Sequence, residues 1–357
     1  MNANKEYLEQ KILAGARIDR IEALALFSHD LTRLGLLADA RRRMVHPSNE
    51  VGFIVDRIIN FTNVCTAACA FCAYHARAGL IEPYRMTIDE VLGRVEELAR
   101  AGGTQVMLQG GLDPEFGLDE CRSLLRAVKK SFPAMYLHSF SPAETVHLAR
   151  REGISIAEVI AALKDAGLDS MPGASDMLVD RVRRTVSPKK LTKDEWVGVM
   201  RALAAAGLKS SATMTYGLGE TLEERVEHLD VVRGVQDETG ILRAFIPWSF
   251  SPARTRMADT VPATGVDYLR VVAVARIYLD NIRFIQAGWL TEGHALAQIA
   301  LAMGANDMGG VLTEEVVVKA TGVDTTADRE GMVRVISAAG RVPVQRDSEY
   351  RTIRSYA

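Results

Sequence analysis

From about residue 51 onward, the sequence alternates between strand-like and helix-like segments, and this rhythm limits the folds that the chain can adopt. Residues 53–62 (FIVDRIINFT) are apolar and β-branched, which is typical of a buried strand. Residues 87–102 begin with Thr87, carry Glu90 three positions later and end in Gly102, which is the pattern of a capped helix. Strands that alternate with helices in this way predict a parallel sheet covered by helices.

The pattern predicts eight strand–helix units. The expected strands are residues 53–62, 104–111, 134–140, 168–173, 209–217, 243–250, 282–289 and 305–310. The expected helices are residues 87–102, 117–132, 141–152, 155–167, 192–207, 221–240, 264–280 and 291–304. Eight such units indicate an α/β fold of the (β/α)8 TIM-barrel type, with a doubly wound open sheet as the alternative.

The two ends of the sequence do not follow the repeat. Residues 5–45 predict two or three helices, and residues 326–350 predict a terminal helix with a tail. We therefore expect N-terminal helices (1–50) packed on a barrel (51–310), followed by a C-terminal helical extension (311–357). The arginines at positions 41–43 are expected on a solvated face rather than in a phosphate site.

The charge balance and the cysteine count exclude several functional classes. The 357 residues carry a formal net charge of -2, so no strong field favours nucleic acid or an anionic membrane. No run of about 18 uncharged apolar residues is present, and residues 1–20 lack the apolar core of a signal peptide. With only 4 cysteines, the chain is expected in the reducing cytoplasm rather than held together by disulfides.

Three of those cysteines, Cys65, Cys69 and Cys72, stand within residues 63–79 (NVCTAACAFCAYHARAG) with the spacing C-x3-C-x2-C. Three interpretations are open: thiols without a ligand, a zinc site completed by His75, or a [4Fe–4S] cluster held by three thiolates with one iron open to a small molecule. The loop follows the first expected strand, at the face where barrel enzymes build their active sites. This position favours the cluster. Cys121, on an expected helix, is assigned no role.

The C-x3-C-x2-C loop, with Phe71 just before its last cysteine, resembles the signature of radical S-adenosylmethionine (SAM) enzymes. The segments INFTNVC, GGTQVMLQGGLDP, LHSFSPAE, SATMTYGLGET, AFIPWSFSP, LDNIRFIQAGW and GANDMGGVLTEEVV resemble the enzymes of the futalosine route to menaquinone and their deazaflavin relatives over about residues 50–350. TQVMLQGG and FIPWSFSP are most similar to dehypoxanthine futalosine cyclases. Two segments depart from that pattern: Asp176 stands in place of a glutamate, and loop 74–87 differs.

The resemblance implies a [4Fe–4S] cluster and SAM as cofactors and a 5′-deoxyadenosyl radical as the reactive species. In the cyclase reaction, that radical takes the hydrogen from C4′ of the ribose in dehypoxanthine futalosine. The carbon radical then adds to the benzoate ring of the same molecule, and loss of an electron and a proton gives the cyclic product. The cofactor supplies the chemistry, while the protein positions the substrate and excludes water.

The resemblance and the strand ends together assign roles to individual residues. Cys65, Cys69 and Cys72 hold the cluster, and the expected cofactor contacts are Tyr74 (adenine), Gln109, Gly110 and Gly111 (methionyl group) and Asp176 (ribose), with a helix N-cap as the alternative role for Asp176. The expected substrate contacts, each with core packing as the alternative, are His138, Ser139, Thr213, Tyr216, Trp248, Gln286, Trp289, Asn306 and Asp307. No side chain is assigned as a catalytic acid or base.

Two other functions remain open at this stage. The first is an aminofutalosine synthase or a deazaflavin-cofactor synthase-like enzyme, and the second is a non-catalytic zinc or iron–sulfur module. The polar residues at eight strand ends argue against the module, which has no use for a polar barrel mouth. The expected partners are a small nucleoside-derived substrate and an electron donor such as flavodoxin or ferredoxin, with no nucleic acid and no membrane.

Overall fold

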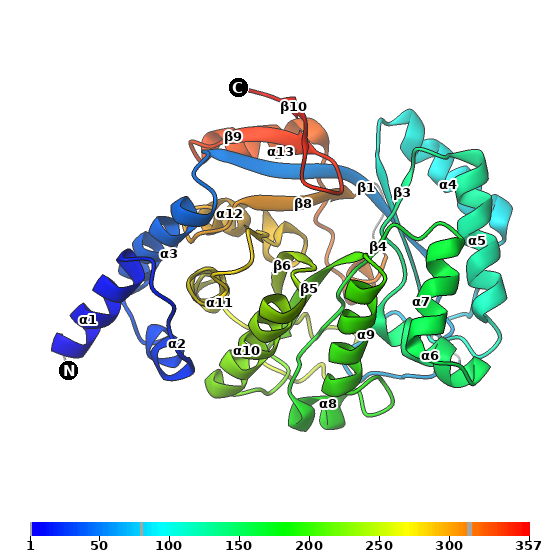
Figure 1. The fold of residues 1–357 in the computed structure, drawn as a ribbon, viewed down its shortest axis with the longest axis horizontal. Coiled ribbons are helices and arrows are strands. Elements are labelled where there is room, and N and C mark those ends of the chain that lie inside the picture. The colour runs from blue at the N-terminus through cyan, green and yellow to red at the C-terminus, as the bar shows by residue number, and fades with distance from the viewer. Residues whose placement is uncertain (1, 79–80, 313–315) are drawn as a thin grey trace.

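The computed structural model describes residues 2–78, 81–312 and 316–357. Within these ranges, eight parallel strands form the centre of the molecule (Figure 1). They are β1 Glu50–Thr62, β2 Gln105–Gly110, β3 Tyr136–Leu137, β4 Ser170–Met171, β5 Lys209–Tyr216, β6 Leu242–Ser249, β7 Phe284–Ile285 and β8 Asp307–Leu312. The expected strands 134–140, 168–173 and 282–289 are thus shorter than the sequence predicts, because only their central residues pair in ladders.

The strands follow one another in barrel order. β1 pairs with β2 and β8, which separates a barrel from an open sheet. The ladders β2–β3, β4–β5, β5–β6 and β6–β7 continue the order, and all are parallel. Single parallel bridges, His138–Ser170 and Gln286–Asp307, join the two remaining seams. The predicted (β/α)8 fold is confirmed, and its two seams are each held by one bridge.

Helices cover the outside of the barrel. They are α4 Ile88–Arg100, α5 Leu118–Ser131, α6 Pro142–Glu152, α7 Ile156–Asp165, α8 Asp180–Val186, α9 Lys193–Ala205, α10 Leu222–Thr239, α11 Gly265–Tyr278 and α12 Trp289–Ala300. The capping box that Thr87 and Glu90 predict is formed at the start of α4. Ser141 caps α6 with Pro142 in its first turn, also as the sequence indicates.

The N-terminal segment forms α1 Asn2–Leu13, α2 Arg20–Leu26 and α3 Leu31–Val45, and α3 packs against α11 of the barrel. The expectation of a solvated arginine face on α3 is wrong for two of the three arginines. Arg41 and Arg42 are buried, because Arg41 donates to the Ala16 carbonyl and Arg42 pairs with Asp39 and donates to the carbonyls of His46 and Ser48. These arginines join α3 to its neighbouring loops.

The C-terminal segment contains the expected helix, α13 Arg329–Ala338, after a short 3-10 turn, Lys319–Thr321. The tail that follows it is extended rather than helical. β9 Val342–Arg346 adds parallel to the first residues of β1, and β10 Thr352–Ser355 pairs antiparallel with β9. In Figure 1 these strands lie along β1 at one end of the barrel. They bring the tail residues Arg346, Ser348 and Tyr350 to the barrel interior.

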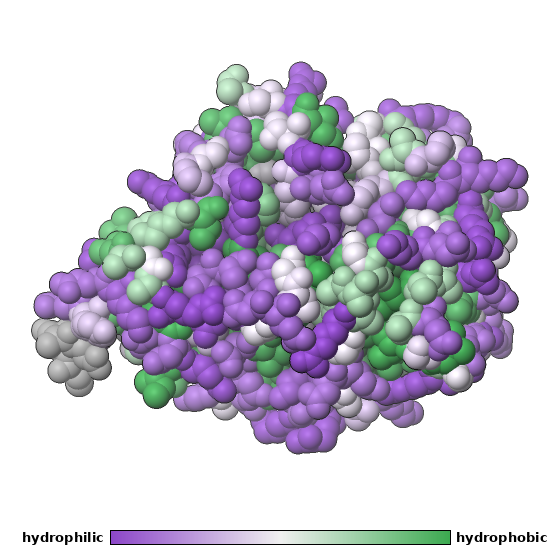
Figure 2. Space-filling model, viewed as in Figure 1, coloured by the Kyte–Doolittle hydropathy of each residue, from purple (hydrophilic) through white to green (hydrophobic). Residues whose placement is uncertain are grey.

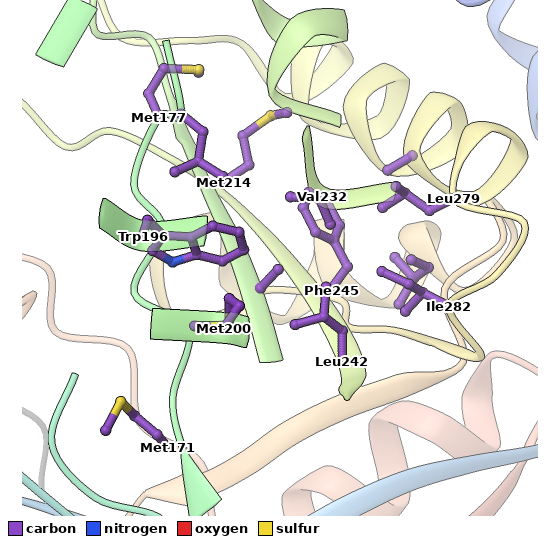
Figure 3. Packing of buried hydrophobic residues seen from close by; sticks show 14 of the residues in the cluster. Met171, Met177, Trp196, Met200, Met214, Val232, Leu242, Phe245, Leu279 and Ile282 are labelled. Atoms are coloured by element: carbon purple, nitrogen blue, oxygen red, sulfur yellow. The ribbon is translucent and has the colours of Figure 1, made fainter. Parts of the chain in front are cut away.

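Apolar side chains fill the layer between the strands and the surrounding helices. Figure 3 shows part of it, where Trp196 and Met200 of α9, Met214 of β5, Val232 of α10 and Phe245 of β6 all lie in one buried cluster. The Trp196 indole also donates to the Gly173 carbonyl over 2.8 Å. The face of the molecule shown in Figure 2 is largely hydrophilic, with scattered apolar residues. None of the helices in the described ranges is long and apolar enough to cross a bilayer.

Candidate active site

The interior of the barrel contains a cavity of about 520 Å³, a size typical of small-molecule sites. Its wall is formed by inward-facing residues of the strands, by the cysteine loop (residues 63–78) and by the tail residues Arg346, Ser348 and Tyr350. The interior of a TIM barrel is ordinarily filled by layers of side chains. Here it is hollow, with the cysteine loop over the carboxyl ends of the strands and the tail at the opposite end.

Backbone and side-chain hydrogen bonds fix the cysteine loop to three neighbouring segments. The Thr66 N–H and hydroxyl both donate to the Leu112 carbonyl over 3.0 Å, and the Ala70 N–H donates to the Val186 carbonyl over 2.7 Å. The buried Asn63 side chain donates to the Glu82 carbonyl and accepts from the Tyr84 N–H, each over 2.8 Å. Ala68, inside the loop, has a left-handed φ of 44°, a strained conformation typical of ligand-binding loops.

Cys65, Cys69 and Cys72 are free thiols that line the same cavity. Burial raises the pKa of Cys69 to about 12 and also raises the pKa of Cys72, so these groups are protonated until a metal binds. Soft thiol ligands from one loop fit an iron–sulfur cluster, in which each thiolate binds its own iron. His75 lies in the same wall, but the described residues contain no trio of His, Cys, Asp or Glu side chains that would hold a single metal ion.

The end of β2 packs directly under this loop. A Cβ atom on Gly111 would lie 2.1 Å from the Val64 carbonyl oxygen and 2.7 Å from the Cys65 Cβ, so only glycine fits there. The Gly110 N–H donates to the buried Glu144 carboxyl over 2.9 Å. Burial raises the pKa of Glu144 to about 7, although the hydrogen bonds from Ser141 and Gly110 oppose this rise. Gln109, Gly110 and Gly111 all line the cavity.

Asp176 lies in the cavity wall, but it does not cap α8, which begins at Asp180 after Val179. Its side chain accepts from Lys190 in an ion pair of 2.6 Å. Burial alone would lower the pKa of Lys190, but Asp176 and the nearby Cys69 outweigh it, and the pKa is raised. Asp176 also has a left-handed φ of 48°. The strained backbone and the buried ion pair hold this polar group beside the cysteine loop.

The strands line the cavity in three levels, because alternate residues of a strand face the same side. In the β1–β2 register, Asp56 stands opposite Gln105 and Ile58 opposite Met107. Asn60 then stands opposite Gln109, next to the cysteine loop. All six residues line the cavity, so from Asp56 upward this wall is polar, then apolar, then polar, with the apolar Ile54 below Asp56. Thr213, Thr215 and Trp248 continue the wall on β5 and β6, and the Trp248 indole donates to the Thr215 hydroxyl over 2.6 Å.

The bottom level, the cavity floor, is formed by Asp56, Gln105, His138, Arg243, Gln286, Arg346 and Tyr350. Arg346 forms a two-pronged ion pair with Asp307 at 2.5 and 2.8 Å, and its guanidinium lies 3.8 Å from the centre of the Tyr350 ring. The Gln286 amide donates to the Tyr350 hydroxyl over 3.2 Å. The tail is therefore fastened to the barrel by polar contacts inside the cavity floor.

Most of the residues predicted for cofactor or substrate contact face the cavity: Tyr74, Gln109, Gly110, Gly111, Asp176, His138, Thr213, Trp248, Gln286 and Trp289. Four do not line it: Ser139, Tyr216, Asn306 and Asp307. The Ser139 hydroxyl accepts from the Leu108 N–H, and Asn306 accepts from Arg276 over 2.7 Å. Tyr216 is fully buried, and Asp307 forms an ion pair with Arg346. These four residues support the wall from behind.

Other polar residues in the wall escape sequence analysis, among them Glu144, Lys190, Thr215, Arg243 and Arg346. Thr215 carries a usable signal, since it lies two positions beyond Thr213 on the same face of a strand. Lys190 lies in a loop after α8, and Arg346 is in the tail. Neither has a local pattern that sets it apart from a solvated cation.

The hollow parallel barrel and the three-thiol loop at its carboxyl end define a class of enzyme that binds an iron–sulfur cluster beside a small-molecule cavity. Family models for the Radical SAM superfamily and for the CofH/MqnC C-terminal region match residues 59–232 and 238–356. The chain belongs to the radical SAM superfamily, in the group that carries the CofH/MqnC C-terminal region. It is a radical SAM enzyme whose cofactors are a [4Fe–4S] cluster and SAM, and Cys65, Cys69 and Cys72 fit the cluster motif.

Three curated relatives match over nearly the whole chain. Cyclic dehypoxanthine futalosine synthase of Streptomyces coelicolor is 39% identical over 98% of this chain and 88% of the relative. The 5-amino-6-(D-ribitylamino)uracil–L-tyrosine 4-hydroxyphenyl transferase of Methanococcoides burtonii is 39% identical over 93% of this chain and 95% of the relative. Aminodeoxyfutalosine synthase of Thermus thermophilus is 36% identical over 97% of this chain and 95% of the relative.

Among solved structures, methylornithine synthase (PylB) aligns with a TM-score of 0.76, covering 95% of this chain and 97% of its own. Its sequence identity is 19%, so this likeness bears on the fold alone.

Proposed function

We propose that this enzyme is a cyclase that converts dehypoxanthine futalosine to its cyclic form in menaquinone biosynthesis. The observation that carries the proposal is the 39% identity to the cyclic dehypoxanthine futalosine synthase of Streptomyces coelicolor across 98% of the chain. The segments TQVMLQGG and FIPWSFSP support the same choice, and both contribute residues to the cavity wall. An electron donor such as flavodoxin or ferredoxin completes the proposed system.

Cys65, Cys69 and Cys72 would hold the cluster, and the cluster and SAM together would supply a 5′-deoxyadenosyl radical for hydrogen abstraction from the substrate. The protein's own contribution is to hold the cofactor and the substrate in fixed positions and to keep water away. Tyr74, Gln109, Gly110, Gly111 and Asp176 are the proposed cofactor contacts, and all of them line the cavity near the cysteine loop. Lys190 holds Asp176 in place through its 2.6 Å ion pair.

The three-level wall suits a substrate with a polar sugar, an apolar aromatic part and a second polar end. Asn60 and Gln109 offer amide groups at the level of the cysteine loop, where the ribose has to lie for hydrogen transfer. Ile58, Met107 and Ile246 line the middle, where a benzoate ring would be shielded from water. Trp248 is held in one orientation by Thr215 and adds a flat aromatic surface.

The test uses the holoenzyme, reconstituted without oxygen and supplied with reductant, SAM and dehypoxanthine futalosine deuterated at C4′. We expect deuterium in the 5′-deoxyadenosine and formation of the cyclic product. SAM cleavage without deuterium transfer or cyclic product would overturn the proposal. Parallel reactions with 5-amino-6-(D-ribitylamino)uracil plus tyrosine, and with an aminodeoxyfutalosine synthase assay, cover the activities that the other two relatives are named for.

A further inference from the structure

Arg243, at the start of β6, has only neutral hydrogen-bond partners in the cavity floor. Its guanidinium donates to the Ser170 hydroxyl over 2.9 Å, to the Tyr136 hydroxyl over 3.3 Å and to the Ser348 carbonyl. It also lies 3.4 Å from Nδ1 of His138. These contacts come from β3, β4 and the tail, so they fix the guanidinium from several sides without neutralising it.

The other cations in the wall already have partners. Arg346 is paired with Asp307, and Lys190 is paired with Asp176. No carboxylate among the residues that the structure describes forms an ion pair with Arg243. A partly buried guanidinium without an anion is unfavourable, because its charge has lost water and gained no counter-charge. The cavity, which Arg243 lines, is where an anion can reach it.

The groups around Arg243 do not cancel its charge. His138 is buried, and burial, with Arg243 and Arg346 beside it, holds its pKa well below the usual range, so the imidazole is neutral. Asp56 is the carboxyl that lines the same floor, and burial raises its pKa to about 7 despite the opposing charge of Arg346. The charge of Arg346 is balanced by Asp307. The floor therefore retains a positive charge at Arg243.

We propose that Arg243 binds a carboxylate of the substrate and so fixes the substrate end that lies farthest from the cysteine loop. On the proposed function, this group is the benzoate carboxylate of dehypoxanthine futalosine. Asp56 and Asn60 are four residues apart on β1, so the floor lies roughly 13 Å below the level of the cysteine loop. An anion at Arg243 would place an aromatic ring at the apolar level of Ile58 and Met107 and direct the sugar toward the loop.

The first test measures binding to the holoenzyme without reductant, so that no turnover is needed. The probes are 3-acetylbenzoate and its neutral amide, 3-acetylbenzamide. We expect Arg243→Gln to weaken binding of the acid about ten- to a hundred-fold, the effect typical of a lost charge-assisted hydrogen bond, and to leave the amide nearly unchanged. Arg243→Lys keeps the positive charge but loses the two parallel N–H donors of the guanidinium. Its affinity for 3-acetylbenzoate should lie between those of wild type and Arg243→Gln. Arg184→Gln, on the exposed side of α8, is the control for removing an arginine.

Equal weakening of the acid and the amide in Arg243→Gln would show a structural role and overturn the proposal, as would unchanged binding of the acid. The second test compares KM and kcat for dehypoxanthine futalosine. We expect a raised KM in Arg243→Gln, with SAM binding retained. If wild type binds 3-acetylbenzoate through Arg243 but does not cyclise dehypoxanthine futalosine, the proposed function fails and the carboxylate site stands. If wild type cyclises dehypoxanthine futalosine but Arg243→Gln binds 3-acetylbenzoate as tightly as wild type does, the carboxylate site fails and the proposed function stands.

Discussion

Gly111 and Cys65 are in direct contact, because the end of β2 lies beneath the cysteine loop with no space for a side chain. A Cβ atom at Gly111 would lie 2.7 Å from the Cys65 Cβ and 2.1 Å from the Val64 carbonyl oxygen. The Val64 oxygen is a backbone atom and the position of the Cys65 Cβ is fixed by the backbone, so neither can turn away as the end of a flexible side chain could. The second glycine of the QGG motif, Gly111, therefore lets β2 support the loop that carries Cys65, in addition to any contact with the cofactor.

Gly111→Ala is expected to displace the cysteine loop and to lower the iron and sulfide content after reconstitution. The free energy of unfolding should also fall, by roughly 1–3 kcal/mol, as in other overpacked sites. Gly93→Ala is the matched control, because Gly93 lies in α4 with nothing within 4 Å of the added methyl group. It should be neutral or slightly stabilising. Normal iron loading in Gly111→Ala would contradict the proposed packing role.

Cys69 and Cys121 offer a comparison of two buried thiols with different expected roles. Cys69→Ala should abolish cluster binding and SAM cleavage, since it removes one of the three thiols that line the cavity. Cys121 lies in the core face of α5, and Cys121→Ala should keep the cluster and cost about 1 kcal/mol of stability through the small cavity it leaves. Iron analysis and the absorbance of the reconstituted proteins check this. A cluster retained in Cys69→Ala would refute the ligand assignment.

Asp176 and Lys190 should be coupled energetically, because each side chain is the charged partner of the other at 2.6 Å in a mostly buried setting. Asp176→Asn and Lys190→Met each leave one charge without its partner, whereas the double variant removes both. We expect the double variant to be more stable than the sum of the single losses predicts, by about 0.5–3 kcal/mol. Urea unfolding of the four proteins provides the cycle. Additive losses would mean that the pair is not energetically significant.

Glu144 should make stability depend on pH below neutrality. Its pKa is raised from 4.5 to about 7 by burial, so between these values the unfolded chain loses the proton while the folded protein keeps it. The free energy of unfolding should therefore fall as pH rises through this window and level off above it. Over the whole window the contribution of Glu144 is at most about 3 kcal/mol.

The test is Glu144→Gln, whose amide oxygen can still accept from the Gly110 N–H, while its amide nitrogen can donate to the Ser141 hydroxyl that donates to the native carboxyl. We expect the variant to gain stability relative to wild type as pH rises from 5 to 8, as measured by urea unfolding at each pH. Asp56 has a raised pKa as well, but it contributes equally to both proteins. A difference between the two proteins that does not change with pH would show that Glu144 does not titrate in this window.

Local patterns explain why so much of the fold can be predicted. The capping box of Thr87 and Glu90 and the Ser141–Pro142 start of α6 are formed as the sequence indicates, because a cap needs only residues within one helical turn. The cysteine spacing identifies the loop for the same reason. Strand lengths and the C-terminal strands β9 and β10 are harder to predict, because pairing depends on the partner strand and not on the segment itself.

The sequence alone determined the order of strands and helices, the helix caps and the three-thiol loop, since each depends on neighbouring residues. Only the tertiary structure decided that Tyr216, Asn306 and Asp307 stand behind the cavity wall and that Arg243 stands in it. Arg243 contacts His138, which comes 105 residues earlier in the sequence, and Ser348, which comes 105 residues later. Which cations keep a free charge depends on such distant contacts, because an ion pair is set by proximity in space, and no local pattern encodes it.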